Sequence, residues 1–219
     1  MNEAANNNWS KVILDHQIDL KLYERQSKNA KLNNFKNTLV DPQSDLANDL
    51  QKDPYIFNLP LLKGKYIETE LENALVERIK DVLLELGNGF SFVGSQYKIV
   101  VEEDEYFIDM LLYHLKLRCY VVVELKSVPF KPEFAGKLNF YLSAVDDMMK
   151  TDLDNPSIGI ILCKGKKKFE VEYSLKDINK PIGVSSYEIT KILPKEVIDT
   201  LPTAEDINLH IDLEDTDES

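Results

Sequence analysis

The sequence predicts a mixed α/β fold in which helices cover both faces of a central sheet. Residues 119–125, CYVVVEL, form a β-branched apolar run typical of a strand buried on both faces. Helix and strand patterns alternate along the chain in the order helix, three strands, helix, strand, as in α/β folds. At 219 residues, with 43% hydrophobic and 29% charged side chains, the chain can bury one main core.

The first third of the chain predicts helices around a connector. Residues 9–34 carry a moderate amphipathic helix pattern, and residues 35–65, rich in proline and polar side chains, indicate a connector. Within the connector, residues 53–57, DPYIF, predict a turn followed by a short packed segment. Residues 66–86 place apolar side chains close to a 3.6-residue repeat, and Gly87 is suited to a helix C-terminus, so one helix is expected there.

The rest of the chain predicts mainly strands. Runs at 89–101, 106–114 and 118–126 are expected to form a meander whose third strand is central. Pro132 is suited to a first helical turn, and apolar spacing predicts a helix from there to about Met149. The remaining segments are strand-like at 157–164, 168–175 and 182–189, followed by a short helix at 193–202.

Charge does not exclude nucleic acid as a partner, although the net charge is −12. Residues 205–219 hold seven acids and no Lys or Arg, which predicts a solvated, disordered tail over residues 203–219. The remainder is close to charge balance, and a bound divalent cation can supply positive charge at a site.

The expected compartment is the cytoplasm. No apolar run approaches the roughly 20 residues of a membrane span, and the first residues lack the pattern of a signal peptide, so no membrane partner is expected. Cys119 and Cys163 each lie in an apolar run, which predicts buried free thiols.

Two strand ends carry the residues that point to chemistry. Asp109 interrupts an apolar run, where a carboxylate needs a partner or a cation. Glu124 and Lys126 end the strongly apolar strand and, two residues apart, share a face. If these strands are adjacent, Asp109 and Glu124 converge into an oxygen-ligand set that suits Mg²⁺ or Mn²⁺. A neighbouring lysine would then stabilise transition-state charge or orient the attacking water.

This pattern resembles the PD-(D/E)XK nuclease superfamily, and more closely its YhcG-like PD-(D/E)XK nuclease family. Matching segments occur in order between residues 53 and 190: DPYIF, ELENALVERI, LLELGNGFSFVGSQ, FIDMLLYH, VVVELK, PEFAGKLNFYL, NPSIGIILCK, VEYSL and PIGVSSYEI. The resemblance implies a restriction-endonuclease-like domain over residues 53–202. Residues 1–52 would then be a helical segment and connector, similar to the end of the winged-helix-like DNA-binding domain that precedes the nuclease in the family.

The resemblance also implies roles for individual residues. Asp109 and Glu124 would bind the metal, and Lys126 would be the catalytic lysine. Glu72 is the preferred acidic residue of the first helix, with Glu70 and Glu77 as rivals.

Three positions depart from the family pattern. Lys137 stands where the family typically has Gln, and it would either assist phosphate binding or dislodge the metal. Ser95 and Leu115 stand where the family usually has basic residues.

The resulting hypothesis is a Mg²⁺-dependent nuclease acting on DNA, compatible with a homodimer that cuts two strands. The alternatives are a nucleic-acid-binding or assembly module with a weakened site, and an interaction domain whose carboxylates are structural. His114 is favoured as a structural histidine. The lysines of residues 164–168 are favoured as a solvated turn, with phosphate contact as the functional alternative.

Overall fold

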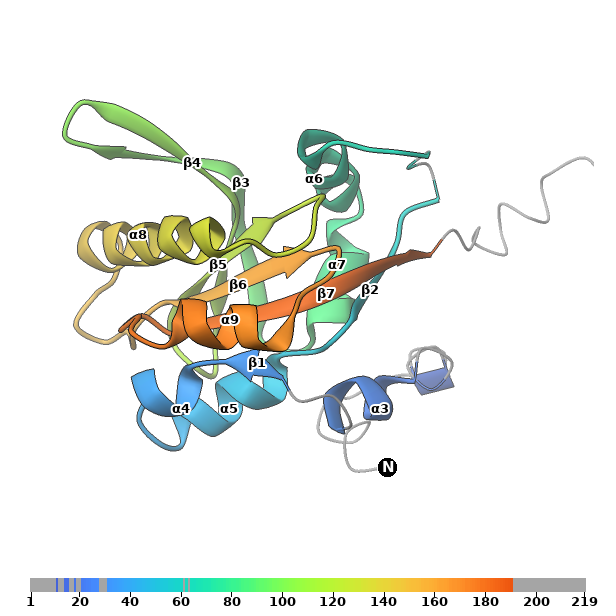
Figure 1. The fold of residues 1–219 in the computed structure, drawn as a ribbon, viewed down its shortest axis with the longest axis horizontal. Coiled ribbons are helices and arrows are strands. Elements are labelled where there is room, and N and C mark those ends of the chain that lie inside the picture. Colours follow the sequence, from blue (N-terminus) through green and yellow to red (C-terminus); the bar gives the residue numbers. More distant parts are fainter. Residues whose placement is uncertain are drawn as a thin grey trace, which may run out of the picture.

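The computed structural model describes residues 21–27, 31–60, 62 and 64–190, together with positions 11, 14, 15 and 18. Within this part of the chain, a seven-stranded sheet has the order β1-β7-β6-β5-β4-β3, and β2 pairs with β7 off this path (Figure 1). The strands are β1 Leu32–Asn33, β2 Tyr55–Asn58, β3 Phe90–Val101, β4 Asp104–His114, β5 Cys119–Leu125, β6 Ile158–Cys163 and β7 Ile182–Thr190. The helices are α3 Leu22–Ser27, α4 Phe35–Thr38, α5 Gln43–Leu50, α6 Glu68–Glu77, α7 Ile79–Leu86, α8 Pro132–Met148 and α9 Lys168–Leu175.

The strand β5 joins an antiparallel half of the sheet to a parallel half. It pairs antiparallel with β4 and parallel with β6, while β3 and β4 form a long antiparallel hairpin. The predicted meander with an interior third strand is therefore confirmed. The parallel pairs β5–β6 and β6–β7 require crossover connections, which α8 and α9 provide.

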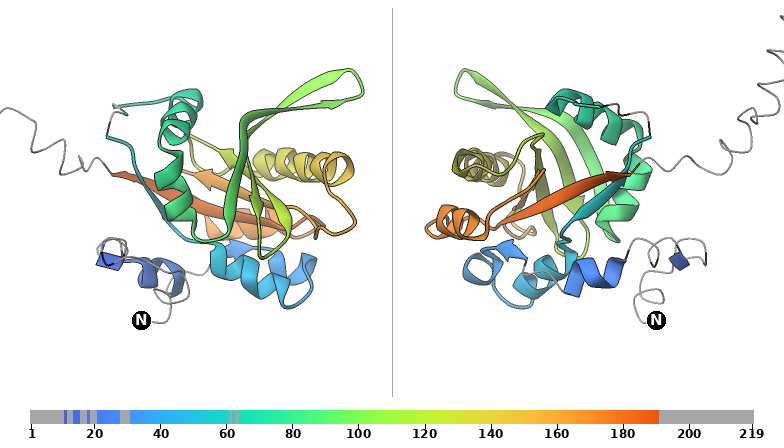
Figure 2. Two further views of the ribbon diagram at one scale, coloured as in Figure 1. Left: turned by 180° about the vertical axis from the view of Figure 1, so that it is seen from behind. Right: turned by 45° about the vertical axis from the view of Figure 1, so that its right-hand side comes forward.

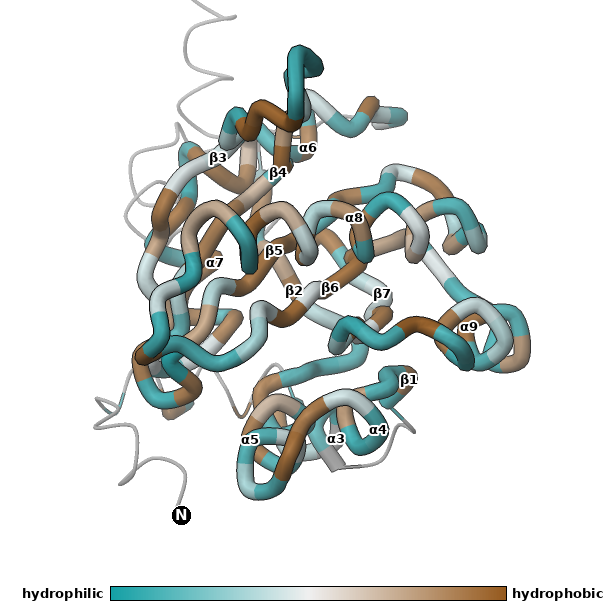
Figure 3. The backbone as a smooth tube through the Cα atoms, turned by 90° about the vertical axis from the view of Figure 1, so that its left-hand side faces the viewer, coloured by the Kyte–Doolittle hydropathy of each residue, from teal (hydrophilic) through white to brown (hydrophobic). Residues whose placement is uncertain are grey.

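Each face of the sheet contributes to a separate hydrophobic core. In the views of Figure 2, α8 and α9 lie on one side of the sheet, and α6 and α7 lie on the other. Along β5, Val121, Val123 and Leu125 belong to the core that includes α6 and α7, whereas Val122 belongs to the core that includes α8. The alternation places Glu124 on the α8 side of the sheet. In Figure 3 hydrophobic segments of the tube lie along the central strands.

The predicted helix over residues 66–86 is two helices, which corrects the expectation of one. Arg78, with φ −111° and ψ 33°, separates α6 from α7, and its side chain donates a 2.7 Å hydrogen bond to Asp81. The break allows α6 to contact β5 while α7 contacts β2 and β3. Gly87 ends α7 with φ 114°, as its position in the sequence predicted.

Residues 168–175 form helix α9, so the predicted strand there is wrong. Apolar residues alternate along this segment, as in a strand, but the parallel pairing of β6 and β7 demands a crossover. The expectations for residues 9–65 also need correction. Most of residues 9–20 lie outside the described residues, and the rest of the predicted helix contains α3 and then β1. The predicted connector contains α4, α5 and β2.

The remaining expectations concern the two cysteines, membrane spans and the C-terminal segments. Cys119 and Cys163 are buried free thiols, and burial raises the pKa of the Cys119 thiol to about 12. None of the helices in the described ranges is both long and apolar enough to cross a membrane. The helix predicted at 193–202 and the acidic tail at 203–219 lie outside the described residues.

Candidate active site

The register between β4 and β5 brings Asp109 and Glu124 to the same place. Met110 lies opposite Val123 in this antiparallel pair, so Asp109 and Glu124 lie one register step beyond it on adjacent strands. Both carboxylates leave the same face of the sheet, since their neighbours Leu111 and Val122 both belong to the core on the α8 side. The convergence expected from the sequence is thus present in the structure.

Glu124 is almost fully buried, at 1% exposure. Its Oε2 accepts a hydrogen bond of 3.0 Å from Lys137 Nζ and lies 3.4 Å from Lys126 Nζ. Its Oε1 is buried and has no hydrogen-bond partner within the described part of the chain. A buried carboxylate oxygen without a partner is costly, so this atom is available to a cation or to a donor that the protein itself does not supply.

Both carboxylates are costly to ionise. Burial raises the pKa of Glu124, and the neighbouring charge of Asp109 raises it further. Burial also raises the pKa of Asp109, although Asp109 Oδ2 accepts a 2.7 Å hydrogen bond from the backbone N–H of Leu125. Positive charge placed between the carboxylates would favour ionisation of both.

Lys126 contacts residues of both α6 and α8. Its Nζ donates hydrogen bonds of 3.1 Å to Glu68 Oε2 and 3.0 Å to the carbonyl of Leu125, and it lies 5.4 Å from the ring centroid of Phe134. The other oxygen of Glu68 accepts a 3.3 Å hydrogen bond from the backbone N–H of Ser127. Sequence reasoning missed Glu68, although its position four residues before Glu72 on one helix face was a signal for it.

Glu72 is buried and approaches the site from α6. Its Oε2 accepts a 2.6 Å hydrogen bond from Gln96 Nε2, and burial raises the pKa of Glu72 with a further contribution from Asp109. The two alternative residues have other environments. Glu70 accepts a 2.9 Å hydrogen bond from the backbone N–H of Ile67 at the start of α6, and Glu77 is exposed. Glu72 is therefore the residue of the three whose electrostatics are linked to Asp109.

Lys137 reaches the site from α8. Besides its contact with Glu124, its Nζ lies 5.0 Å from the ring centroid of Tyr141, a buried residue of the α8 core. Partial burial lowers the pKa of Lys137, but the charge and hydrogen bond of Glu124 outweigh this effect, so its pKa is raised. Lys137 remains charged at neutral pH and offsets part of the charge on Glu124.

The site fits a hard divalent cation with few protein ligands. Among the described residues, no three His, Cys, Asp or Glu side chains form a metal-binding group. Mg²⁺ is commonly bound by one or two carboxylates, with waters and phosphate oxygens completing the shell. Asp109 and Glu124, with the unpartnered Glu124 Oε1, match that mode of binding.

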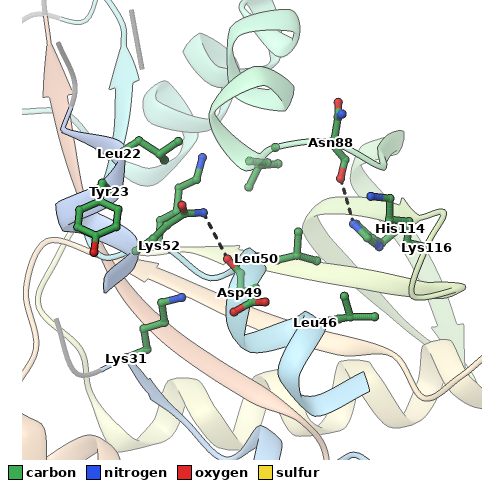
Figure 4. Close-up of a pocket in the computed structure, with 13 residues that line it drawn as sticks. Leu22, Tyr23, Lys31, Leu46, Asp49, Leu50, Lys52, Asn88, His114 and Lys116 are labelled. Carbon is green, nitrogen blue, oxygen red and sulfur yellow. Dashed lines mark hydrogen bonds between the residues drawn. The ribbon is translucent and has the colours of Figure 1, made fainter. Parts of the chain in front are cut away.

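His114 is the last residue of β4 and Leu115 follows it, five and six residues beyond Asp109. His114 accepts a hydrogen bond from the Leu117 N–H at Nδ1, and its Nε2 lies 3.2 Å from the carbonyl of Asn88, so it is a structural histidine. Burial lowers its pKa. Figure 4 shows it lining a pocket together with residues of α3, α5 and α7.

The comparisons with known proteins identify the family of this chain. The family model described as YhcG PDDEXK nuclease domain matches residues 48–202. The Escherichia coli (strain K12) protein named "Putative nuclease YhcG" is 32% identical over 199 residues, covering 88% of this chain and 52% of the relative. The chain therefore spans about half the length of that curated relative.

Two solved structures show weaker similarity. The EndoMS–dsDNA2 complex matches with a TM-score of 0.39 and 13% identity, covering 61% of this chain and 49% of that chain. A repair endonuclease from Pyrococcus abyssi matches with a TM-score of 0.37 and 12% identity, covering 59% and 49%.

The range matched by the family model includes the candidate site. The matched range contains the mixed sheet, Asp109 on β4 and the sequence Glu124-Leu125-Lys126 at the end of β5, the arrangement that the sequence resemblance implied. With more than half of its length matched by the family model, the chain belongs to the YhcG PDDEXK nuclease domain family, and its fold is the restriction-endonuclease-like α/β fold.

Proposed function

We propose that this protein is a nuclease that hydrolyses phosphodiester bonds in DNA and depends on Mg²⁺ or Mn²⁺. The observation that carries the proposal is the buried, unpartnered Oε1 of Glu124, which lies across the strand register from Asp109 and close to the ammonium of Lys126. Membership of a nuclease-domain family supports the reaction class. We also propose that the protein is cytoplasmic and acts as a homodimer. Its nuclease domain would extend from residue 53 to residue 202.

Asp109 and Glu124 are the residues that would hold the metal. A divalent ion bound by two carboxylates supplies Lewis acidity, which neutralises phosphate charge and lowers the pKa of a bound water. The protein's own residues supply orientation. Glu68 and the Leu125 carbonyl hold Lys126 Nζ beside Glu124, where it can donate to a phosphate oxygen or to the attacking water.

Glu72 and Gln96 form a second positioning element. Their hydrogen bond of 2.6 Å holds a buried carboxylate whose pKa is raised by burial and also by the charge of Asp109. Gln96 donates to the Glu72 carboxylate from its side chain and from its backbone, and a carboxylate has further lone pairs that can accept a hydrogen bond from a water. In this role Glu72 would orient a water toward the scissile phosphate and would not hold the metal.

Lys137 favours a second candidate function. Its Nζ contacts Glu124 Oε2 at 3.0 Å, so an ammonium already neutralises one of the two metal-binding carboxylates. If this ammonium prevents metal binding, the protein is a nucleic-acid-binding module that keeps the nuclease fold. If Lys137 moves to a phosphate when metal binds, the nuclease remains active.

Cleavage of supercoiled plasmid with Mg²⁺ or Mn²⁺ tests the proposal. Wild type is expected to nick or linearise plasmid. Glu124→Ala, which removes a proposed metal ligand, and Lys126→Ala, which removes the ammonium beside the reacting phosphate, are each expected to reduce the rate at least about 100-fold. Glu77→Ala, exposed on α6, is the matched control and should cut like wild type.

Two outcomes would decide against the nuclease. Equal cutting by wild type and Glu124→Ala would show that the assigned site is wrong. Intact plasmid that is nevertheless retarded in a gel would favour the binding module, and Lys137→Gln would then be expected to restore Mn²⁺ binding in a titration by calorimetry. RNA and DNA substrates of matched sequence distinguish the preferred nucleic acid.

A further inference from the structure

Helix α9 presents two aromatic side chains to solvent. Phe169 and Tyr173 are 66% and 74% exposed, and their rings stack with centroids 6.3 Å apart and 26° between the ring planes. Val171 and Leu175 on the same helix are buried in the core on the α8 side. The core thus accounts for two of the four large apolar residues of α9, and packing within the described chain does not account for the stacked pair.

The loop that leads into α9 lies beside the loop that follows β5, the strand that carries Glu124. The basic loop, residues 164–168 (KGKKK), connects to that segment by two backbone hydrogen bonds. Lys164 N–H donates to the Val128 carbonyl at 3.1 Å, and Phe130 N–H donates to the Gly165 carbonyl at 2.8 Å. Because β5 and β6 are parallel, both loops leave the sheet at the edge where Lys126 lies.

Lys164 is connected to Lys126 by contacts through two tyrosines, Tyr66 and Tyr187. Its Nζ lies 4.0 Å from the ring centroid of Tyr66, whose hydroxyl is 3.4 Å from that of Tyr187. The Tyr187 hydroxyl donates a 3.3 Å hydrogen bond to the carbonyl of Lys126. A phosphate bound at Lys164 would therefore belong to a strand that also passes the proposed site of cleavage.

The surface around the aromatic pair is basic, in contrast to the acidic chain as a whole. Residues 164–176 contain five lysines and two glutamates. Lys166 forms an ion pair with Asp53 and Lys168 forms one with Glu172, whereas Lys164, Lys167 and Lys176 are exposed. Lys176 follows Tyr173 by three residues and so shares its face of the helix. This combination of exposed aromatic rings and lysines is unlike the core of a protein interface, which is depleted in lysine.

We propose that the basic loop and the pair Phe169–Tyr173 bind a single-stranded segment of nucleic acid that continues from the cleavage site. Lys164 and Lys167 contact its phosphates, and the aromatic pair stacks against an unpaired base. Base faces are accessible to aromatic side chains only where bases are unpaired, so the surface selects nucleic acid with a single-stranded stretch next to the cut. This inference rests on the proposed nuclease function and specifies its substrate class.

The first test measures binding without cleavage. Fluorescence anisotropy in EDTA compares a blunt DNA duplex, a single strand, and a duplex with a single-stranded extension. Wild type is expected to bind the last two more tightly than the blunt duplex. Phe169→Ala/Tyr173→Ala should weaken binding of those two about tenfold and leave blunt-duplex affinity within about twofold, as expected for loss of base stacking. Leu153→Ala, which removes another exposed apolar side chain, is the matched control.

A second pair of variants separates phosphate contact from stacking. Lys164→Ala/Lys167→Ala should weaken binding of all three DNAs and reduce the salt dependence of binding. Lys116→Ala, exposed in the turn between β4 and β5 at the opposite end of the sheet, should do neither. An extension carrying 2-aminopurine should lose fluorescence when it binds wild type, and the aromatic double variant should abolish this quenching.

The proposal is overturned if the aromatic double variant binds all three DNAs as wild type does. It is also overturned if this variant changes only the oligomeric state measured by light scattering, which would assign the face to a second copy of the chain. Failure of the nuclease proposal gives a different result: Glu124→Ala would cut plasmid as fast as wild type. Binding measured in EDTA does not depend on that outcome.

Discussion

At the scale of single residues, the candidate site holds two carboxylates whose burial disfavours their ionised form. Glu124 is 1% exposed and has one oxygen without a partner within the described residues, and Asp109 faces it from the next strand. Burial raises the pKa of both carboxyls, which means that ionising them costs folding free energy. A protein that needed only a stable sheet would gain stability with neutral side chains at these positions.

Asp109→Asn should therefore stabilise the metal-free protein at neutral pH. The raised pKa means that ionised Asp109 lowers stability as pH rises above the unfolded pKa of about 3.9, and fully so above the folded pKa. Asn also retains an oxygen for the Leu125 N–H. In EDTA at pH 7 the variant should gain about 1 kcal/mol, or about 3 °C in Tm, by calorimetry.

The pH dependence provides the check on this prediction. The gain should shrink as pH falls toward the unfolded pKa of about 3.9 and disappear well below it, where Asp109 is protonated in both the folded and the unfolded state. Asp104→Asn, exposed at the start of the same strand, is the control and should leave Tm unchanged at both pH values. A lower Tm for Asp109→Asn at pH 7 would contradict the assigned cost of ionisation.

At the scale of elements, the close packing of α8 on β6 determines where Lys137 lies. A Cβ built on Gly159 of β6 would be 2.6 Å from Leu138 Cδ2 and 3.0 Å from Leu142 Cδ1. These two leucines belong to α8 and are fully buried. Glycine at position 159 thus permits the approach that carries Lys137, the neighbour of Leu138, to Glu124.

Gly159→Ala should destabilise the protein by about 2 kcal/mol, as overpacking of a core does. It should also alter the Lys137–Glu124 contact, because α8 must shift to relieve the overlap. Gly136→Ala is the matched control within α8, since a Cβ there meets nothing within 4 Å. Alanine at position 136 should stabilise the helix by about 0.5–1 kcal/mol. Denaturant unfolding of the two variants would contradict this account if both changed stability in the same direction.

Helix α9 shows how an element can mislead when its sequence is considered alone. Phe169, Val171, Tyr173 and Leu175 alternate with polar residues, a period that predicts a half-buried strand with all four on one face. In the helix these residues separate into a buried pair and an exposed pair. The exposed pair is visible as a surface feature only once the segment is known to be helical.

At the scale of the whole molecule, a buried cluster of charges joins the N-terminal part of the described chain to the nuclease sheet. Arg25 of α3 forms an ion pair with Glu85 of α7, and Glu85 Oε1 also accepts a 3.0 Å hydrogen bond from the N–H of Ile56. Lys52 Nζ lies 3.8 Å from Glu85 Oε2. One carboxylate therefore holds together α3, the segment before β2, β2 itself and α7.

Glu85→Gln should lower the free energy of unfolding by about 3 kcal/mol, because it leaves the buried charges of Arg25 and Lys52 without their carboxylate. Urea unfolding followed by circular dichroism measures the loss. Glu77→Gln, exposed at the end of α6, should change stability by less than about 0.5 kcal/mol. Equal midpoints for the two variants would show that the cluster does not contribute to folding.

Much of the fold was predictable because local patterns specify it. The β-branched run of β5, the strands on either side of it and the helix beginning at Pro132 all occur close to the predicted bounds. The break at Arg78 and the helical state of residues 168–175 were not predictable from periodicity. Both depend on packing and on sheet connectivity, which act between segments distant in sequence.

The sequence by itself determined the mixed α/β class and was sufficient to propose Asp109, Glu124 and Lys126 as site residues, because residue type and strand alternation are local properties. Only the tertiary structure decided which partners these residues have. Strand register set Asp109 against Glu124, α6 delivered Glu68 to Lys126, and α8 delivered Lys137 to Glu124. The physical reason is that a buried charge takes whichever partner packing brings within hydrogen-bond distance, and neither spacing nor composition records that choice.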